Sequence, residues 1–126
     1  MKLAYVDTSY IVAIAFGEPG AGTLAARMKG FDRLFSSNLL EAEFRSALLR
    51  EKVSDPGRHF LSWITWIYPN RPLTREIDRI AAIGYLRGAD LWHLANALFL
   101  SPCGKELTFL TADRRQAATA KELGFA

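Results

Sequence analysis

Apolar and polar residues form alternating blocks along the chain, and these blocks predict strands and helices in turn. Short apolar runs typical of buried strands occupy Leu3–Val6, Arg33–Ser36 and Leu107–Thr111. A weaker strand is indicated near Trp66–Tyr68. Because helical segments separate these runs, the order favours an α/β fold, with helices covering both faces of a parallel sheet. We expect one α/β/α domain over residues 1–126, with about four or five central strands.

Stop signals and helical spacing define the segments between the predicted strands. Asn38 is predicted as the N-cap of a long helix, Leu39–Ser54, which the turn Asp55-Pro56-Gly57 ends. The following residues, Arg58–Ile67, are predicted to turn back as the second arm of a helical hairpin. Further helices are expected at Ser9–Phe16, Ala21–Lys29, Thr74–Arg87, Ala89–Leu100 and Asp113–Leu123.

Two features of the predicted helices need a separate explanation. The segment Phe60–Tyr68 is unusually aromatic, and it either faces the core or forms a partly exposed patch for a partner, since Trp and Tyr are enriched at binding hot spots. Gly84 costs roughly 1 kcal/mol inside a helix. We expect close helix packing on the inner face of Thr74–Arg87 to account for it.

Composition narrows the class of protein. The chain has 126 residues, half of them hydrophobic, and no apolar run reaches the roughly 18 residues of a membrane span. The single cysteine, Cys103, cannot form an internal disulfide, and the first residues do not resemble an export signal, so we expect a cytoplasmic protein. Eleven of the sixteen basic residues are arginine and the net charge is +3, which favours a polyanionic partner.

Carboxylates that follow the predicted strands are the candidate chemistry. Asp7 separates two apolar segments, and Asp113 follows the last strand. Ligands of parallel sheets bind beyond the carboxyl ends of the strands, so both side chains are expected at the functional edge. Each also has a structural alternative as a helix N-cap, for which Asp113 has Gln116 three residues later, as in a capping box.

Further acidic side chains lie on two predicted helices. Asp90 falls in the first turn of a very apolar helix, where the macrodipole favours a negative charge, and His93 follows one turn later. We expect His93 to be a partly buried histidine bonded to Asp90 or to a backbone carbonyl. On Leu39–Ser54, Glu41 has Arg45 as an i+4 ion-pair partner, whereas Glu43 has no cationic partner on its own helix. We therefore choose Glu43 for the site.

Four acids from four segments of the chain can meet at one site. Clustered carboxylates repel one another and raise one another's pKa, so such a site needs a cation at neutral pH. Oxygen-only ligands favour Mg²⁺ or Mn²⁺ over zinc. A hard ion of this kind can lower the pKa of bound water and neutralise charge on a phosphate. An acidic site in a basic chain therefore suits the hydrolysis of a phosphodiester.

The motifs "YVDTSYIVAIAF", "SSNLLEAEFRSALLR", "LRGADLWHLANALFL" and "FLTADRRQAATAKELG" resemble, in order and spacing, the acidic motifs of PIN-domain ribonucleases. The short chain looks most like the VapC-type toxins of toxin–antitoxin pairs. The resemblance implies that the catalytic and metal-binding acids are Asp7, Glu43, Asp90 and Asp113, supported by Ser9 and Thr111. Arginines near these motifs are expected to contact RNA, namely Arg45, Arg87, Arg114 and Arg115.

The same resemblance implies an activity and partners. Members of the family typically cut single-stranded or looped RNA with Mg²⁺ or Mn²⁺ and leave a 5′-phosphate. They commonly form homodimers and are silenced by a VapB-type antitoxin whose tail enters the groove. We expect a metal-dependent endoribonuclease toxin. The alternatives are an RNA-processing or decay nuclease of the same family without an antitoxin, and an inactive PIN module that only binds.

Overall fold

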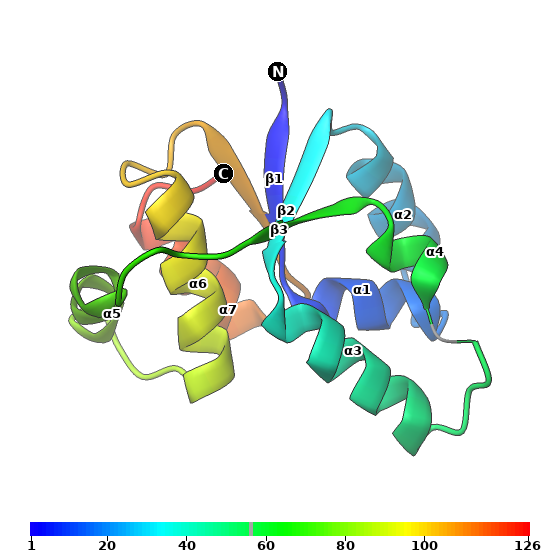
Figure 1. Ribbon diagram of the computed structural model, residues 1–126. Coiled ribbons are helices and arrows are strands. Elements are labelled where there is room, and N and C mark those ends of the chain that lie inside the picture. The colour runs from blue at the N-terminus through cyan, green and yellow to red at the C-terminus, as the bar shows by residue number, and fades with distance from the viewer. Residues whose placement is uncertain (56) are drawn as a thin grey trace.

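Four parallel strands form the centre of the structure, a computed structural model that describes residues 1–55 and 57–126 (Figure 1). The strands are β1 (Leu3–Val6), β2 (Arg33–Ser37), β3 (Ile64–Ile67) and β4 (Leu107–Leu110), in the spatial order β3-β2-β1-β4. The helices are α1 (Thr8–Ala15), α2 (Ala21–Lys29), α3 (Leu39–Arg50), α4 (Arg58–Leu61), α5 (Thr74–Ala81), α6 (Gly88–Leu100) and α7 (Arg114–Glu122). The predicted α/β/α domain with a parallel sheet is confirmed.

Helices cover both faces of the sheet because successive strand residues point to opposite sides. Tyr5 packs with α5, α6 and α7 on one face, whereas its neighbours Ala4 and Val6 pack with α1, α2 and α3 on the other. Figure 1 shows the two groups of helices on opposite sides of the strands. Each face thus has its own hydrophobic core, and β1 contributes to both.

The order of the strands creates a switch point at β1. From β1 the chain passes to β2 on one side, whereas β4 pairs with β1 on the other side. Crevices at such switch points, outside the carboxyl ends of the strands, are where open α/β sheets bind ligands. The ends of β1 and β4 are joined here by a bond from the Asp7 amide to the Leu110 carbonyl, at 3.0 Å.

The predicted helical arm Arg58–Ile67 is wrong. Only α4 is helical in this segment, and β3 follows it as a parallel partner of β2, with Leu34 opposite Ile64. The β3 residues are β-branched or aromatic and therefore suit a pleated strand. The weak strand predicted near Trp66–Tyr68 exists, but it begins and ends earlier in the chain.

Two predicted helices end early. The helix expected over Thr74–Arg87 ends at Ala81, so Gly84 lies outside it, and nothing stands within 4 Å of where a Gly84 Cβ would be. The close packing expected at this glycine is therefore wrong; its low helix propensity is consistent with the chain leaving the helix first. The long helix ends at Arg50 rather than Ser54. Pro56, part of the turn predicted after it, lies outside the described residues.

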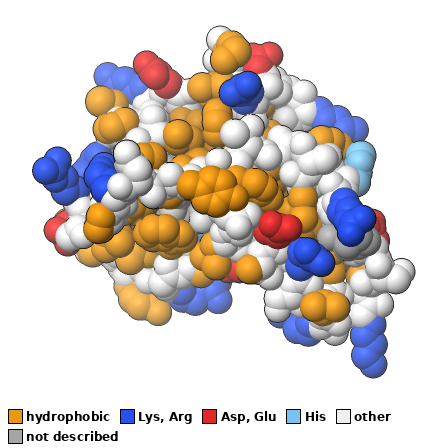
Figure 2. Space-filling view, viewed as in Figure 1, with side chains coloured by type: hydrophobic (Ala, Val, Ile, Leu, Met, Phe, Trp, Pro, Cys, Tyr) orange, Lys and Arg blue, Asp and Glu red, His pale blue; other side chains and the backbone are white. Residues whose placement is uncertain are grey.

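The aromatic segment contains both residues that pack against the core and a residue that is exposed, so each of the two alternatives holds for part of it. Trp63 and Trp66 are half-buried and pack against the core formed with α1–α3, whereas Tyr68 is 70% exposed. Figure 2 shows hydrophobic side chains gathered on the face that lies over β3.

None of the helices in the described part of the chain is both long and apolar enough to span a bilayer.

Candidate active site

Asp7 lies at the carboxyl end of β1 and is only 1% exposed. It occupies the N-cap position of α1, but its side chain makes no capping hydrogen bond. Instead its Oδ1 accepts a bond from Ser9 Oγ, at 2.7 Å. The alternative that Asp7 serves as a helix cap is therefore wrong, and its carboxylate is held at the edge of the sheet by a neighbouring hydroxyl.

Ser9 and Thr111 connect the ends of β1 and β4. Their hydroxyl oxygens are 3.1 Å apart, and Ser9 Oγ also accepts a bond from the Ala112 amide at 3.0 Å. Thr111 Oγ1 accepts a bond from the Asp113 amide, at 3.0 Å. These bonds connect Ser9, which donates to Asp7, with the residues that lead into α7.

Asp113 caps α7, as the capping alternative predicts. Its Oδ1 accepts a bond from the Gln116 amide, at 2.9 Å. The Gln116 side chain does not complete a capping box, because it bonds to Thr111 Oγ1 and, through Nε2, to the Asp90 carbonyl at 3.1 Å. This fully buried glutamine therefore ties α6 to α7 and sets the spacing between the two segments that carry Asp90 and Asp113.

Glu43 bonds to side chains of two other helices, whereas Glu41 pairs within its own helix. Glu43 Oε1 lies 2.7 Å from Thr8 Oγ1 and 2.8 Å from His93 Nε2, so α3 is linked to both α1 and α6. Glu41 instead forms the predicted i+4 ion pair with Arg45, at 3.7 Å. The distinction drawn from the missing cationic partner thus agrees with where the two side chains point.

His93 is almost completely buried rather than partly buried, and its partners differ from those expected. Its Nδ1 lies 2.7 Å from the Tyr5 hydroxyl, and its Nε2 contacts Glu43. An ionised carboxylate only accepts, so Nε2 must donate to Glu43. The Tyr5 oxygen accepts from the Ser37 amide, at 3.0 Å, which leaves its proton for Nδ1. With hydrogen on Nε2 and the Tyr5 hydroxyl donating to Nδ1, every bond of this chain is satisfied, and we assign the hydrogens in this way.

Burial is the main influence on the pKa of Asp7, the residue that follows β1. It raises the pKa of Asp7 to about 6, although the hydrogen bond from Ser9 acts in the opposite direction. Repulsion from Asp90 contributes less. The upward shift expected for this residue is thus present, with desolvation rather than like-charge crowding as its main cause.

Glu43 departs from the expectation that crowding raises its pKa. Desolvation does raise the pKa of this carboxyl, but hydrogen bonds from His93 and Thr8 outweigh it, and the net pKa lies below the usual value. Glu43 is therefore ionised across the neutral range, whereas Asp7 takes up a proton in mild acid. The two acids have different roles in the pH response because one is solvated by donors and the other is desolvated.

Arg87 and Arg115 lie beside two of the acids. Together with Asp90 and Asp113 they line a cavity of about 250 Å³, where Arg87 Nε lies 3.3 Å from an Asp90 oxygen. Arg45, paired with Glu41, lies outside this cavity. Arg114 is exposed in the first turn of α7. Only two of the four arginines singled out from the sequence therefore line the cavity with the acids.

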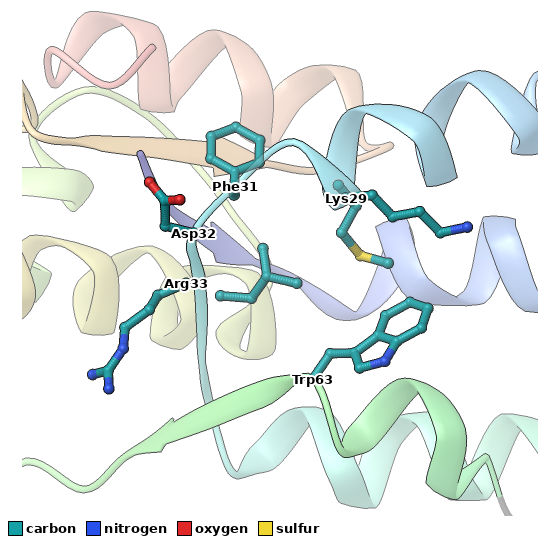
Figure 3. Close-up of a pocket in the computed structure, with 7 residues that line it drawn as sticks. Lys29, Phe31, Asp32, Arg33 and Trp63 are labelled. Atoms are coloured by element: carbon teal, nitrogen blue, oxygen red, sulfur yellow. The ribbon is translucent and has the colours of Figure 1, made fainter. Parts of the chain in front are cut away.

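A second cavity, of about 300 Å³, lies at the opposite edge of the sheet, at the amino end of β2 (Figure 3). Figure 3 shows Phe31, Asp32, Arg33 and Trp63 around it. None of the four candidate acids lines this cavity. Its position away from the carboxyl ends of the strands separates it from the candidate chemistry.

The donor chemistry of the site suits a hard divalent ion, since the four candidate side chains offer only carboxylate oxygens. In the described part of the chain, however, no three Asp, Glu, His or Cys side chains stand close enough to hold an ion together. Glu43 is bonded to Thr8 and His93, and Asp90 to Arg87. The residues fit Mg²⁺ or Mn²⁺ in chemistry, and binding requires these carboxylates to draw together.

Three residues of this site were not identified from the sequence. Tyr5 stands in an apolar strand run and gives no polar signal there, and Thr8 is of a residue type that commonly caps helices. The sequence predicts Gln116 only as the partner of Asp113 in a capping box. A hydroxyl or amide that orients an acid is not distinguishable by spacing from one that caps a helix, so these roles depend on the packing of separate elements.

The chain is similar in sequence to proteins of one known family. The PIN domain family model matches residues 4–126. Two relatives from Mycobacterium tuberculosis, ribonuclease VapC45 of strain CDC 1551 / Oshkosh and ribonuclease VapC49 of strain ATCC 25618 / H37Rv, are each 32% identical to this chain over 130 residues. The matched region covers 91% of this chain and 87% of each relative. The predicted family is therefore confirmed, and the chain belongs to the PIN-domain family, among proteins of the VapC type.

Proposed function

We propose that this protein is an endoribonuclease of the VapC type that requires Mg²⁺ or Mn²⁺. The observation that carries the proposal is a buried carboxylate, Asp7, at the switch point of a parallel sheet, where it is not used to cap a helix. Three further acids, Glu43, Asp90 and Asp113, complete the proposed site. The similarity to two ribonucleases over nine-tenths of the chain supports the same activity.

Each residue has a role in this proposal. The four acids, Asp7, Glu43, Asp90 and Asp113, hold the ion, and Ser9 and Thr111 orient the carboxylate of Asp7 and the start of α7. A bound ion supplies a water of lowered pKa and neutralises negative charge on the scissile phosphate. The RNA backbone is bound by arginines near the site, namely Arg87, Arg114 and Arg115. Arg45, on α3, contacts the RNA farther from the acids.

The proposal includes partners. VapC-type proteins are the toxin half of a pair, so the cognate VapB-type antitoxin is the proposed inhibitor, acting in the cytoplasm. A homodimer is proposed on the same basis, and the half-buried aromatic segment around β3 offers an apolar surface for either contact. Sedimentation of the purified chain, alone and with the product of a neighbouring small gene, tests both.

The two glutamates of α3 give a matched test of the activity. Glu43→Gln removes a charge at the site and is expected to lower the rate by about 10²–10³, by analogy with the loss of one preorganised oxyanion donor. Glu41→Gln removes a partly exposed ion pair with Arg45, keeps an amide oxygen that can accept from Asn38, and is expected to leave cleavage near normal. Both variants are assayed on one RNA at saturating Mn²⁺, the 5′ ends are mapped, and folding is checked by circular dichroism.

Wild-type protein that cuts no cellular RNA with either ion would contradict the proposed activity. An inactive Glu41→Gln variant beside an active Glu43→Gln variant would show that the assignment of the site on α3 is wrong. Cleavage that survives removal of all divalent ions by EDTA would refute the metal requirement while leaving the nuclease activity intact.

A further inference from the structure

Tyr85 is a large apolar side chain that the fold leaves in solvent beside the candidate site. It is 71% exposed and lies in the connection between α5 and α6. Together with Leu86, it lines the cavity that also holds Asp90 and Asp113. A group that fills this cavity therefore contacts both the tyrosine ring and two of the acids.

Two arginines, Arg87 and Arg115, line the same cavity as this ring, and Arg87 also pairs with Asp90. The guanidinium carbon of Arg115 lies 6.0 Å from the centre of the Tyr85 ring, within reach of a cation–π contact. Arg87, whose side chain is 74% exposed, extends from the same connection. An aromatic face flanked by cations is the combination with which proteins bind single-stranded nucleic acid, where bases stack and phosphates pair with charge.

The position of Arg115 is not explained by the stability of its helix. Arg114 and Arg115 occupy the first turn of α7, which contains no acidic residue. Cations there oppose the helix macrodipole, which favours negative charge at an N-terminus. The Asp113 carboxylate already caps this helix end, so the positive charge available to a phosphate here is that of the two arginines.

We propose that Tyr85 is a stacking platform for one unpaired RNA base, with Arg87 and Arg115 on its adjacent phosphates. The inference rests on the proposed ribonuclease activity and names the subsite that holds the nucleotide next to the acids. The cavity, at about 250 Å³, is smaller than the roughly 300–1,000 Å³ of sites for drug-sized ligands, so it suits one planar ring. A paired base does not expose its face, so single-stranded RNA is the form recognised.

The test compares two tyrosines of equal exposure. Tyr85→Ala is expected to weaken binding of a short fluorescein-labelled single-stranded RNA by about 5- to 100-fold, the range that base–aromatic stacking supplies. Tyr85→Phe keeps the ring and is expected to retain wild-type affinity. Tyr68→Ala, at a tyrosine that is 70% exposed and outside the cavity, is the control and is expected to bind normally. Binding is measured by anisotropy in EDTA, so that no RNA is cut.

An abasic nucleotide moved along the same RNA locates the stacked base. At one position, loss of the base is expected to weaken the wild type and leave Tyr85→Ala unchanged, because the partner of the ring is already gone. A duplex of the same sequence is expected to bind both proteins equally. Because these readouts need no cleavage, wild-type protein that binds in this way yet never cuts RNA with Mn²⁺ would refute the nuclease activity alone.

Three results would overturn the stacking platform. They are a Tyr85→Ala affinity equal to that of Tyr68→Ala, an equal loss on duplex and single strand, and no single-stranded binding by the wild type at low salt. An unchanged RNA affinity beside a weakened complex with the antitoxin would assign the ring to protein recognition and overturn it as well. Unfolding curves of all three variants are expected to coincide with the wild type, since both rings are exposed.

Discussion

At the end of β1, Asp7 carries a carboxylate into a position that is 1% exposed, and burial raises its pKa to about 6. A folded-state pKa above the unfolded value of 3.8 means that the native state binds the proton more tightly. The stability from this proton is fully present below the unfolded pKa and is lost as pH rises through about 6. The ionised residue therefore opposes folding at neutral pH when no cation is bound.

Asp7→Asn is expected to stabilise the metal-free protein near neutral pH by on the order of 3 kcal/mol, because it replaces a desolvated charge with a neutral amide. The gain is expected to vanish near pH 4, where the native aspartate is already protonated. Urea unfolding at several pH values measures it, with the exposed Asp78→Asn as a control. A loss of stability at neutral pH would mean that Asp7 has a structural role that its hydrogen bonds do not reveal.

His93 is a positioning residue in this arrangement, because it reaches the site only through Glu43. His93→Leu removes the donor to Glu43, and His93→Gln retains an amide N–H. Partners that orient a metal ligand are typically worth about 10–100-fold in affinity, so Mn²⁺ binding is expected to weaken for the leucine variant and to be largely rescued by glutamine. Calorimetric titration with Mn²⁺ measures this without any RNA. Equal affinity for both variants would show that the histidine serves packing alone.

At the scale of elements, the loop before β4 and the end of α7 approach each other through glycine. Gly104 has a φ of +73°, and a Cβ there would lie 2.8 Å from the Gly124 carbonyl carbon. Gly104→Ala is expected to destabilise the fold by about 2 kcal/mol or more, because a left-handed conformation costs 1–2 kcal/mol and the clash is with backbone. Chemical denaturation measures the change.

Gly22 gives the matched opposite case. It lies inside α2, and nothing stands within 4 Å of where its Cβ would be. Gly22→Ala is expected to stabilise the protein by roughly 0.5–1 kcal/mol, since alanine loses less backbone entropy in a helix. If both substitutions shift the denaturation midpoint in the same direction, the approach of the two loops does not determine the outcome.

At the scale of the whole molecule, the proposed metal site assembles four acids within a chain of net charge +3. An ion that binds only the folded state is expected to stabilise it by RT ln(1 + [L]/Kd), about 2.7 kcal/mol at 100 times Kd. Millimolar Mn²⁺ is thus expected to raise the melting temperature of the wild type by several degrees, and that of Asp7→Asn by much less. A melting temperature indifferent to both Mn²⁺ and Mg²⁺ would contradict the metal site.

The parts of the fold that the sequence predicts well are those with an unambiguous local signal. The run Leu3–Val6 followed by Asp7 marks a buried strand and the polar residue at its end, and β1 has the predicted bounds. The segment Ile64–Ile67 has a weaker signal, because its β-branched and aromatic residues suit a strand but so short a run also allows a helical arm. Its pairing with β2, a contact distant in sequence, decides the matter.

The alternation of strands and helices, the family, and the lack of a cationic partner for Glu43 on its own helix could all be read from the sequence, because they depend on local spacing and charge. Only the tertiary structure decided that Tyr5, Ser37 and His93 form one hydrogen-bonded chain to Glu43, and that Gln116 joins α6 to α7. The physical reason is that a buried donor must find an acceptor wherever the packing brings one, and sequence distance does not limit that choice.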